Sequence, residues 1–166
     1  MCFGFIGGDR LKFGNVILAV ASIAVIDIML NFVLGIALIP SIGSYWGMNS
    51  AAIISILIAA LFVGYIFAIK IQEESRIRAV GKISVLFASV MSLSVVMSAA
   101  ANPYYKDWID ETLRSMYTTS AWTKADWYVY GQLSLLTFVV LNVVLALVLT
   151  FIGVYAGSML RKPKKS

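Results

Sequence analysis

Asp27 is the side chain of this sequence with the greatest potential for chemistry. It lies near the middle of an apolar run, residues 13–39, and Asn31 follows four residues later. Residues four apart share one face of a helix. An ionised carboxylate inside a membrane costs several kcal/mol, so Asp27 must find a partner, line a water-filled space or stay protonated.

Asn142 is the partner that we expect for this pair. It lies near the middle of the last apolar run, at a depth between those of Asp27 and Asn31 when both runs are counted inward from their outer ends. The three side chains would form a hydrogen-bonded cluster across two helices, in which each bond contributes about 0.6 kcal/mol on average and fixes the register. A polar clamp is one interpretation of the cluster. A proton or cation site and a contact with another subunit are the alternatives.

The rest of the sequence argues against catalysis. It contains no histidine and a single cysteine, Cys2, which excludes intrachain disulfides and metal clusters built from thiolates or imidazoles. An enzyme needs a nucleophile with a base, a carboxylate pair or a metal cluster, and Asp27 is alone at its depth. We therefore predict a noncatalytic protein without a metal or cofactor.

Four apolar runs must position these polar residues. Of the 166 residues, 61% are hydrophobic and 13% charged, against about 25% charged in soluble proteins. A bilayer core of about 30 Å is crossed by about 20 residues of apolar helix, and every run has that length. We predict an all-α protein, an integral membrane four-helix bundle that forms a single transmembrane domain over residues 1–166. The predicted spans are residues 13–39, 48–71, 80–101 and 127–160.

Basic side chains gather on one side of these spans. Ten of the thirteen Lys and Arg residues do so, and positive residues mark the cytoplasmic side. We therefore predict a multi-pass protein of the cell membrane with both termini in the cytoplasm, and we attribute the net charge of +5 to this topology rather than to a nucleic-acid partner. The ten are Arg10, Lys12, Lys70, Arg76, Arg78, Lys82, Arg161, Lys162, Lys164 and Lys165, and the other three are Lys106, Arg114 and Lys124.

The connection between the third and fourth spans predicts an amphipathic outer helix. Asn102 suits an N-cap and Pro103 a first helical position, and apolar residues recur at helical spacing over residues 103–117. Such a helix would lie along the outer membrane surface or cap the bundle. The residues expected at this outer interface are Tyr105, Trp108, Ile109, Leu113, Met116, Trp122 and Trp127.

Small residues predict close packing of the second span against the third. Lipid provides no hydrophobic drive for helix association, so small side chains that let helices approach become important. Serines that line a polar path through the membrane are the alternative interpretation of the third span. The predicted packing residues are Ala60, Gly64 and Ala68 in the second span, and Ser84, Ala88 and Ser92 in the third.

Two functions are compatible with these patterns. The favoured one is a noncatalytic accessory or assembly subunit of a membrane complex, which acts through helix packing and its aromatic outer segment. The alternative is a small proton- or cation-coupled transporter or channel subunit that uses Asp27. The predicted partners are the lipid bilayer and either other membrane subunits or further copies of the chain.

Overall fold

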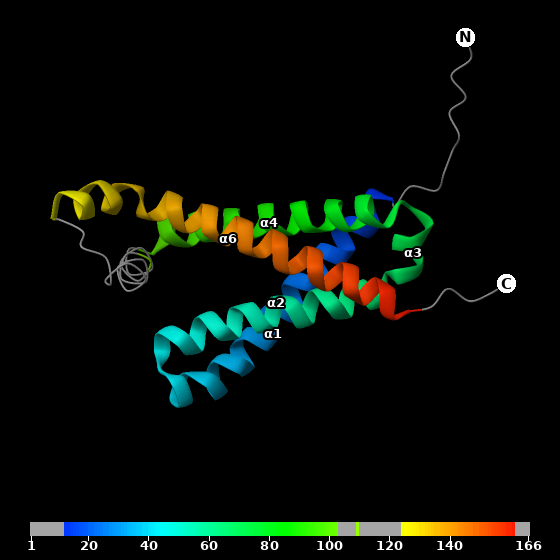
Figure 1. Cartoon of the computed structure of the whole chain (residues 1–166), viewed down its shortest axis with the longest axis horizontal. Helices are drawn as coiled ribbons and strands as arrows, with labels where there is room; N and C mark the ends of the chain where they lie inside the picture. The colour runs from blue at the N-terminus through cyan, green and yellow to red at the C-terminus, as the bar shows by residue number, and fades with distance from the viewer. Residues whose placement is uncertain (1–11, 103–108, 110–123, 162–166) are drawn as a thin grey trace, which may run out of the picture. The chain divides into compact units, whose positions relative to one another are not determined.

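The computed structural model describes residues 12–102, 109 and 124–161 (Figure 1). This part of the chain forms helices and no strand, which confirms the all-α prediction. The helices are α1 (Phe13–Ile42), α2 (Ser44–Ile66), α3 (Ala68–Glu73), α4 (Arg76–Ala101) and α6 (Lys124–Leu160).

Four of the described helices are long and apolar enough to cross a membrane, as the sequence predicted. The helix boundaries differ from the predicted spans in ways that have physical causes. Pro40 lies in the last turn of α1, which continues to Ile42 because a proline there removes only one backbone hydrogen bond. The second span is shorter than expected, since α2 ends at Ile66 and the more polar α3 follows. The candidate spans are Phe13–Ile42, Asn49–Ile66, Arg76–Ser98 and Leu136–Leu160.

The predicted outer helix, residues 103–117, lies outside the described residues except for Ile109, which is buried. Trp127 belongs to α6, and the structure does not describe its side chain. The prediction of an outer interface therefore stays a prediction. Its other members, Tyr105, Trp108, Leu113, Met116 and Trp122, are outside the described part of the chain.

The chain divides into two compact units. The first contains α1, α2, α3, α4 as far as Phe87 and α6 from Leu147 onward. The second is Ala88–Ala146 and so contains the remaining parts of α4 and α6. The buried core of the first unit is built from aliphatic side chains, alanines and two phenylalanines, Phe67 and Phe87. Its members include Val16, Ala19, Val20, Ile23, Ala59, Val63, Ile71, Val80, Ile83, Phe87 and Val154.

A single residue, Gly43, separates α1 from α2. Its φ of 85° lies in the left-handed region, which glycine enters without steric cost, and its N–H donates to the Ile39 carbonyl at 3.0 Å. The reversal brings the start of α2 onto the end of α1 at Gly47, where a Cβ atom would lie 2.7 Å from the Cα of Ile39. Glycines at positions 43 and 47 therefore make the tight hairpin of α1 and α2 possible.

The small-residue face of α2 packs against α6. A Cβ atom on Gly64 would lie 2.8 Å from the Cα of Val154, and one on Gly153 would lie 2.6 Å from the Ala60 side chain. Gly157 approaches the backbone at Leu61 in the same way. The partner of Ala60 and Gly64 is thus α6, which the sequence did not indicate. The expected packing of this face on the third span stays a prediction.

Two serines of the third span, Ser84 and Ser92, bond to carbonyls of their own helix. Ser84 is buried in the first unit, and its hydroxyl donates to the Val80 carbonyl at 2.9 Å. In the second unit, the Ser92 hydroxyl donates to the Ser89 carbonyl at 2.8 Å, and Ala88 is buried. Such bonds provide a hydroxyl with a partner within its own helix. The presence of these two serines in an apolar helix therefore does not require a polar path through the membrane. Ala68, the last of the predicted packing residues, is buried at the start of α3.

We predict that Gly64→Ala destabilises the protein and that Gly81→Ala does not. The added methyl group at position 64 would overlap the backbone of α6, and overpacking of this kind costs about 1–3 kcal/mol. A Cβ atom on Gly81 meets nothing within 4 Å, so this variant gains helix propensity of up to about 1 kcal/mol. Thermal unfolding of both variants in the same detergent measures the difference. Equal melting temperatures would show that α2 and α6 do not pack closely here.

Candidate functional site

The buried carboxyl group of Asp27 is hydrogen-bonded to Ser55. Asp27 is 5% exposed in α1 and Ser55 is fully buried in α2. The Ser55 hydroxyl donates to Oδ1 of Asp27 at 2.5 Å and lies 3.1 Å from the carbonyl of Ala52. Asp27 therefore has a hydrogen-bond partner on the neighbouring helix of the hairpin.

This geometry accommodates both protonation states of Asp27. A serine hydroxyl has one hydrogen to donate and can also accept. With a carboxylate, Ser55 donates to Asp27. With a carboxylic acid, Asp27 donates to Ser55 Oγ and Ser55 donates to the Ala52 carbonyl, so both hydroxyl hydrogens have acceptors. A proton on Asp27 thus requires only that the hydrogen of Ser55 turn from one acceptor to the other.

Helix packing places Ser55 opposite Asp27. Ala51, Ser55 and Ala59 follow one another at intervals of four residues, and all three are fully buried. Their small side chains let α1 approach α2 closely along this face. The sequence reasoning missed Ser55, although this second series of small residues, on a different face of α2 from Ala60 and Gly64, was a signal that could have found it.

Asn31 lies one turn beyond Asp27 on α1 and is half-buried. Within the described part of the chain, its carboxamide makes no hydrogen bond. Asn142 belongs to the second unit and is bonded within its own helix, where its amide nitrogen donates to the Phe138 carbonyl at 2.8 Å. The predicted cluster of Asp27, Asn31 and Asn142 stays a prediction, while Ser55 is the partner that the structure shows for Asp27.

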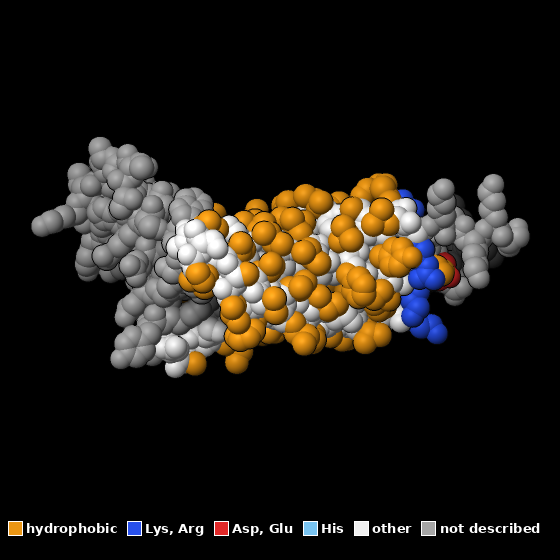
Figure 2. Space-filling view, turned by 90° about the horizontal axis from the view of Figure 1, so that it is seen from below, with side chains coloured by type: hydrophobic (Ala, Val, Ile, Leu, Met, Phe, Trp, Pro, Cys, Tyr) orange, Lys and Arg blue, Asp and Glu red, His pale blue; other side chains and the backbone are white. Residues whose placement is uncertain are grey.

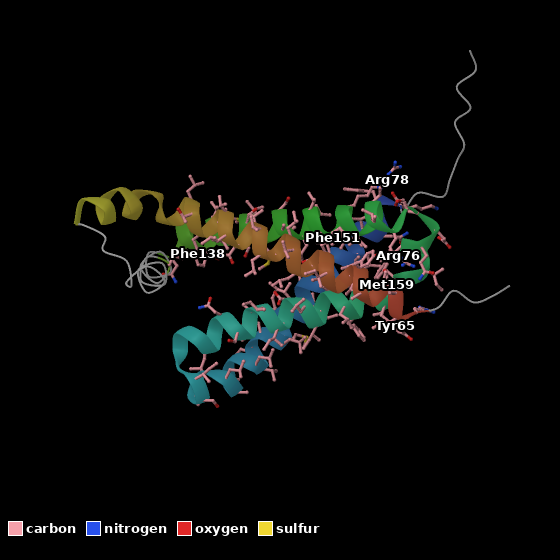
Figure 3. The ribbon with its side chains drawn as sticks, viewed as in Figure 1. Tyr65, Arg76, Arg78, Phe138, Phe151 and Met159 are labelled. Carbon is pink, nitrogen blue, oxygen red and sulfur yellow. The ribbon has the colours of Figure 1, made fainter. Side chains whose placement is uncertain are left out.

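Basic side chains lie together at one end of the first unit, as the space-filling view shows (Figure 2). They come from α3, the start of α4 and the residue after α6. Lys82 pairs with Glu74 at 2.6 Å, whereas Arg78 points away from the helices (Figure 3). This distribution agrees with the charge asymmetry of the sequence.

Two of these basic side chains connect helices. Lys70 donates to the Asn15 side chain at 3.1 Å and lies over the Phe67 ring. Arg161 lies over the Tyr65 ring and donates to the Ile66 carbonyl at 3.4 Å, near the end of α2. Cations are favourable at helix C-termini because the helix dipole is negative there. Part of the basic charge therefore stabilises the fold.

Gln72 of α3 forms hydrogen bonds with the end of α6, at the same end of the first unit as the basic side chains. Its amide nitrogen donates to the Ser158 carbonyl at 2.9 Å and to the Arg161 carbonyl at 3.1 Å. The last carbonyls of a helix have no partner within the helix. The side chain of Gln72 therefore supplies donors that α6 itself cannot provide.

No family model, no curated protein and no solved structure matches this chain. The function proposed below therefore rests on the residues and contacts of the chain itself.

We predict that Ser55→Ala destabilises the protein and that Thr150→Val does not. The first change removes the hydrogen-bond partner of a buried carboxyl group, and interhelical hydrogen bonds in membrane proteins contribute about 0.6–1.7 kcal/mol. Thr150 is a matched control, because it is also fully buried and its hydroxyl makes no hydrogen bond within the described residues.

Unfolding by titration with a denaturing detergent measures both variants. A double-mutant cycle of Ser55→Ala with Asp27→Leu, in which neither replacement side chain can form a hydrogen bond, then isolates the coupling between the two side chains. A coupling of zero would show that the hydrogen bond between Ser55 and Asp27 does not stabilise the protein.

Proposed function

We propose that this protein is a noncatalytic multi-pass protein of the cell membrane and acts as an accessory or assembly subunit of a membrane complex. The observation that carries the proposal is how its polar side chains within the candidate spans are used. Asp27 and Ser55 join α1 to α2, and Asn142 and Ser84 bond to carbonyls of their own helices. These contacts either join two helices or provide a polar side chain with a partner in its own helix. Both are expected of a bundle whose role is structural.

The exposed surface supports the same proposal. Ile28 and Phe32 of α1 are 68% and 71% exposed, and comparable apolar side chains line α4 and α6. Contiguous apolar surface of this extent is found on proteins that contact lipid or protein partners. The proposed orientation has both termini in the cytoplasm, because basic residues gather at one end of the first unit and flank membrane spans on that side.

We expect tags at the two termini to be accessible from the cytoplasmic side only. Protease treatment of intact cells and of inverted membrane vesicles, each followed by detection of the tag, measures this. Tags found on opposite sides of the membrane would overturn the four-span topology.

We expect other membrane proteins to accompany this chain when it is purified gently from its native membrane. Quantitative mass spectrometry of the purified material measures their ratio to the chain, and a mock purification from cells without the tag is the control. Recovery of the chain as a lone monomer at native abundance would contradict a role as a subunit.

A second candidate function is favoured by one specific observation at Asp27. The site holds a proton on Asp27 or releases it with a single rearrangement of the Ser55 hydrogen, between Asp27 and the Ala52 carbonyl. An intramembrane carboxyl group of this kind is characteristic of proton and cation pathways. We infer that, if the protein transports an ion, Asp27 is the group that binds it.

A flux assay in liposomes separates the two functions. Under the assembly proposal, wild type, Asp27→Asn and Ser55→Ala show no flux of protons or cations in any gradient, and Asp27→Asn folds normally because asparagine can still bond to Ser55. Flux by the wild type that disappears in Asp27→Asn, with assembly unchanged, would establish the transport function instead.

A further inference from the structure

We propose that Arg76 and Arg78, at the start of α4, bind the phosphate headgroup of an anionic phospholipid. Both residues belong to the first unit and to the end of it where basic side chains gather (Figure 2). The described residues at this end include six basic side chains and only two acidic ones. The basic ones are Lys12, Lys70, Arg76, Arg78, Lys82 and Arg161, and the acidic ones are Glu73 and Glu74.

The chain itself leaves the charges of Arg76 and Arg78 without a partner. The side chains of Lys70, Lys82 and Arg161 bond to other groups of the first unit. Within the described part of the chain, those of Arg76 and Arg78 form no ion pair and no hydrogen bond. Arg76 is half-buried and its Nε is buried without a partner, whereas Arg78 is exposed and points away from the helices (Figure 3). These two arginines are therefore available to an anion from outside the chain.

The position of the two arginines in α4 is unfavourable for the chain alone. The first turn of a helix is the positive end of its dipole, where acidic side chains are stabilising and basic ones are not. The first turn of α4 contains Arg76 and Arg78 and no acidic residue. Glu74, just before the helix, is already paired with Lys82. A bound anion would offset this repulsion, so a negative charge is what complements the site.

Arginine side chains suit a phosphate in particular. The planar guanidinium group can donate two parallel hydrogen bonds to two oxygens of one phosphate, which an ammonium group cannot do. Further positive charge lies close by, because Gln72 bonds to the Arg161 carbonyl at 3.1 Å. Arg76 follows Gln72 by four residues, a separation of at most about 14 Å along the chain. The charge of Arg161 thus adds to the attraction for a phosphate at Arg76 and Arg78.

The surroundings of the site favour a lipid over another anion. The candidate span of α4 begins at Arg76, and that of α6 ends at Leu160, next to Arg161. In the proposed membrane orientation, these arginines lie at the depth of the lipid headgroups. Ile77, between the two arginines, is 66% exposed, and the basic side chains border the apolar surface (Figure 2). A phospholipid offers a phosphate to the arginines and an acyl chain to Ile77 in a single molecule.

This inference rests on the membrane location that we propose above. It goes beyond the proposed function, because it names a lipid class as a partner whether or not further subunits are present.

Titration of the full-length protein with phosphatidylglycerol in a neutral detergent tests the site. Native mass spectrometry gives the fraction of protein with bound lipid and hence the affinity. Arg76→Gln and Arg78→Gln are each expected to lower the affinity about fivefold, the contribution of one basic residue near an anionic surface. Lys70→Gln is the matched control, since it removes the same charge from a side chain that already bonds to Asn15, and it is expected to have a much smaller effect. Equal losses in all three variants would show that only the total charge matters and would overturn the proposal.

Thermal unfolding separates lipid binding from folding. In detergent without lipid, Arg78→Gln is expected to melt at the temperature of the wild type or above it, because it removes a basic residue from the first turn of a helix. Added phosphatidylglycerol then raises the melting temperature of the wild type more than that of the variant. A lower melting temperature of the variant without lipid would show that Arg78 has a partner within the protein, which would overturn the proposal.

Other ligands of the site give different results. Phosphatidylcholine that binds as tightly as phosphatidylglycerol, inorganic phosphate that stabilises the wild type equally, or a polyglutamate peptide that binds more tightly would each overturn the lipid site. None of these measurements depends on topology or on copurified subunits. A failure here therefore leaves the proposed function in place, whereas terminal tags on opposite sides of the membrane would contradict the proposed topology alone.

Discussion

The constraint on which this structure depends is that a polar group surrounded by apolar side chains has no water to bond to. A polar side chain in such surroundings is stabilised when it bonds to another group of the protein. Asp27 bonds to Ser55, while Ser84, Ser92 and Asn142 bond to backbone carbonyls of their own helices. Two side chains differ, since the Asn31 carboxamide and the buried Thr150 hydroxyl make no hydrogen bond within the described part of the chain.

The same constraint explains the central position of α2 in the first unit. With no hydrophobic drive between helices in lipid, close contact of small residues must hold them together. One face of α2 presents Ala51, Ser55 and Ala59, the face that carries the hydrogen bond to α1, and another presents Ala60 and Gly64 to α6. Helix α2 thus carries small side chains on two of its faces, which allows it to contact two other helices at once.

The sequence predicted the helical class and the four apolar spans because length and hydropathy are local properties. It also identified Asp27, since a carboxyl group in an apolar run is evident without a structure. It missed Ser55, because serine is common in membrane helices and only packing shows which one meets Asp27. It missed the contact of Gly64 with Val154 for a similar reason: small residues show that a face packs closely, but not which helix covers it.

The packing of α2 against α6 has a consequence for biosynthesis. The two contact segments, around Ala60 and around Gly153, are far apart in the chain, so α2 is synthesised well before the part of α6 that covers it. Until then, the groove at Gly64 has no helix α6 to fill it. Gln72 likewise cannot form its bonds to the carbonyls of Ser158 and Arg161 until this last part of the described chain has been synthesised. Truncation upstream of residue 147 would remove Gly153 and Val154, and it would leave the Gly64 face of α2 without the helix that covers it.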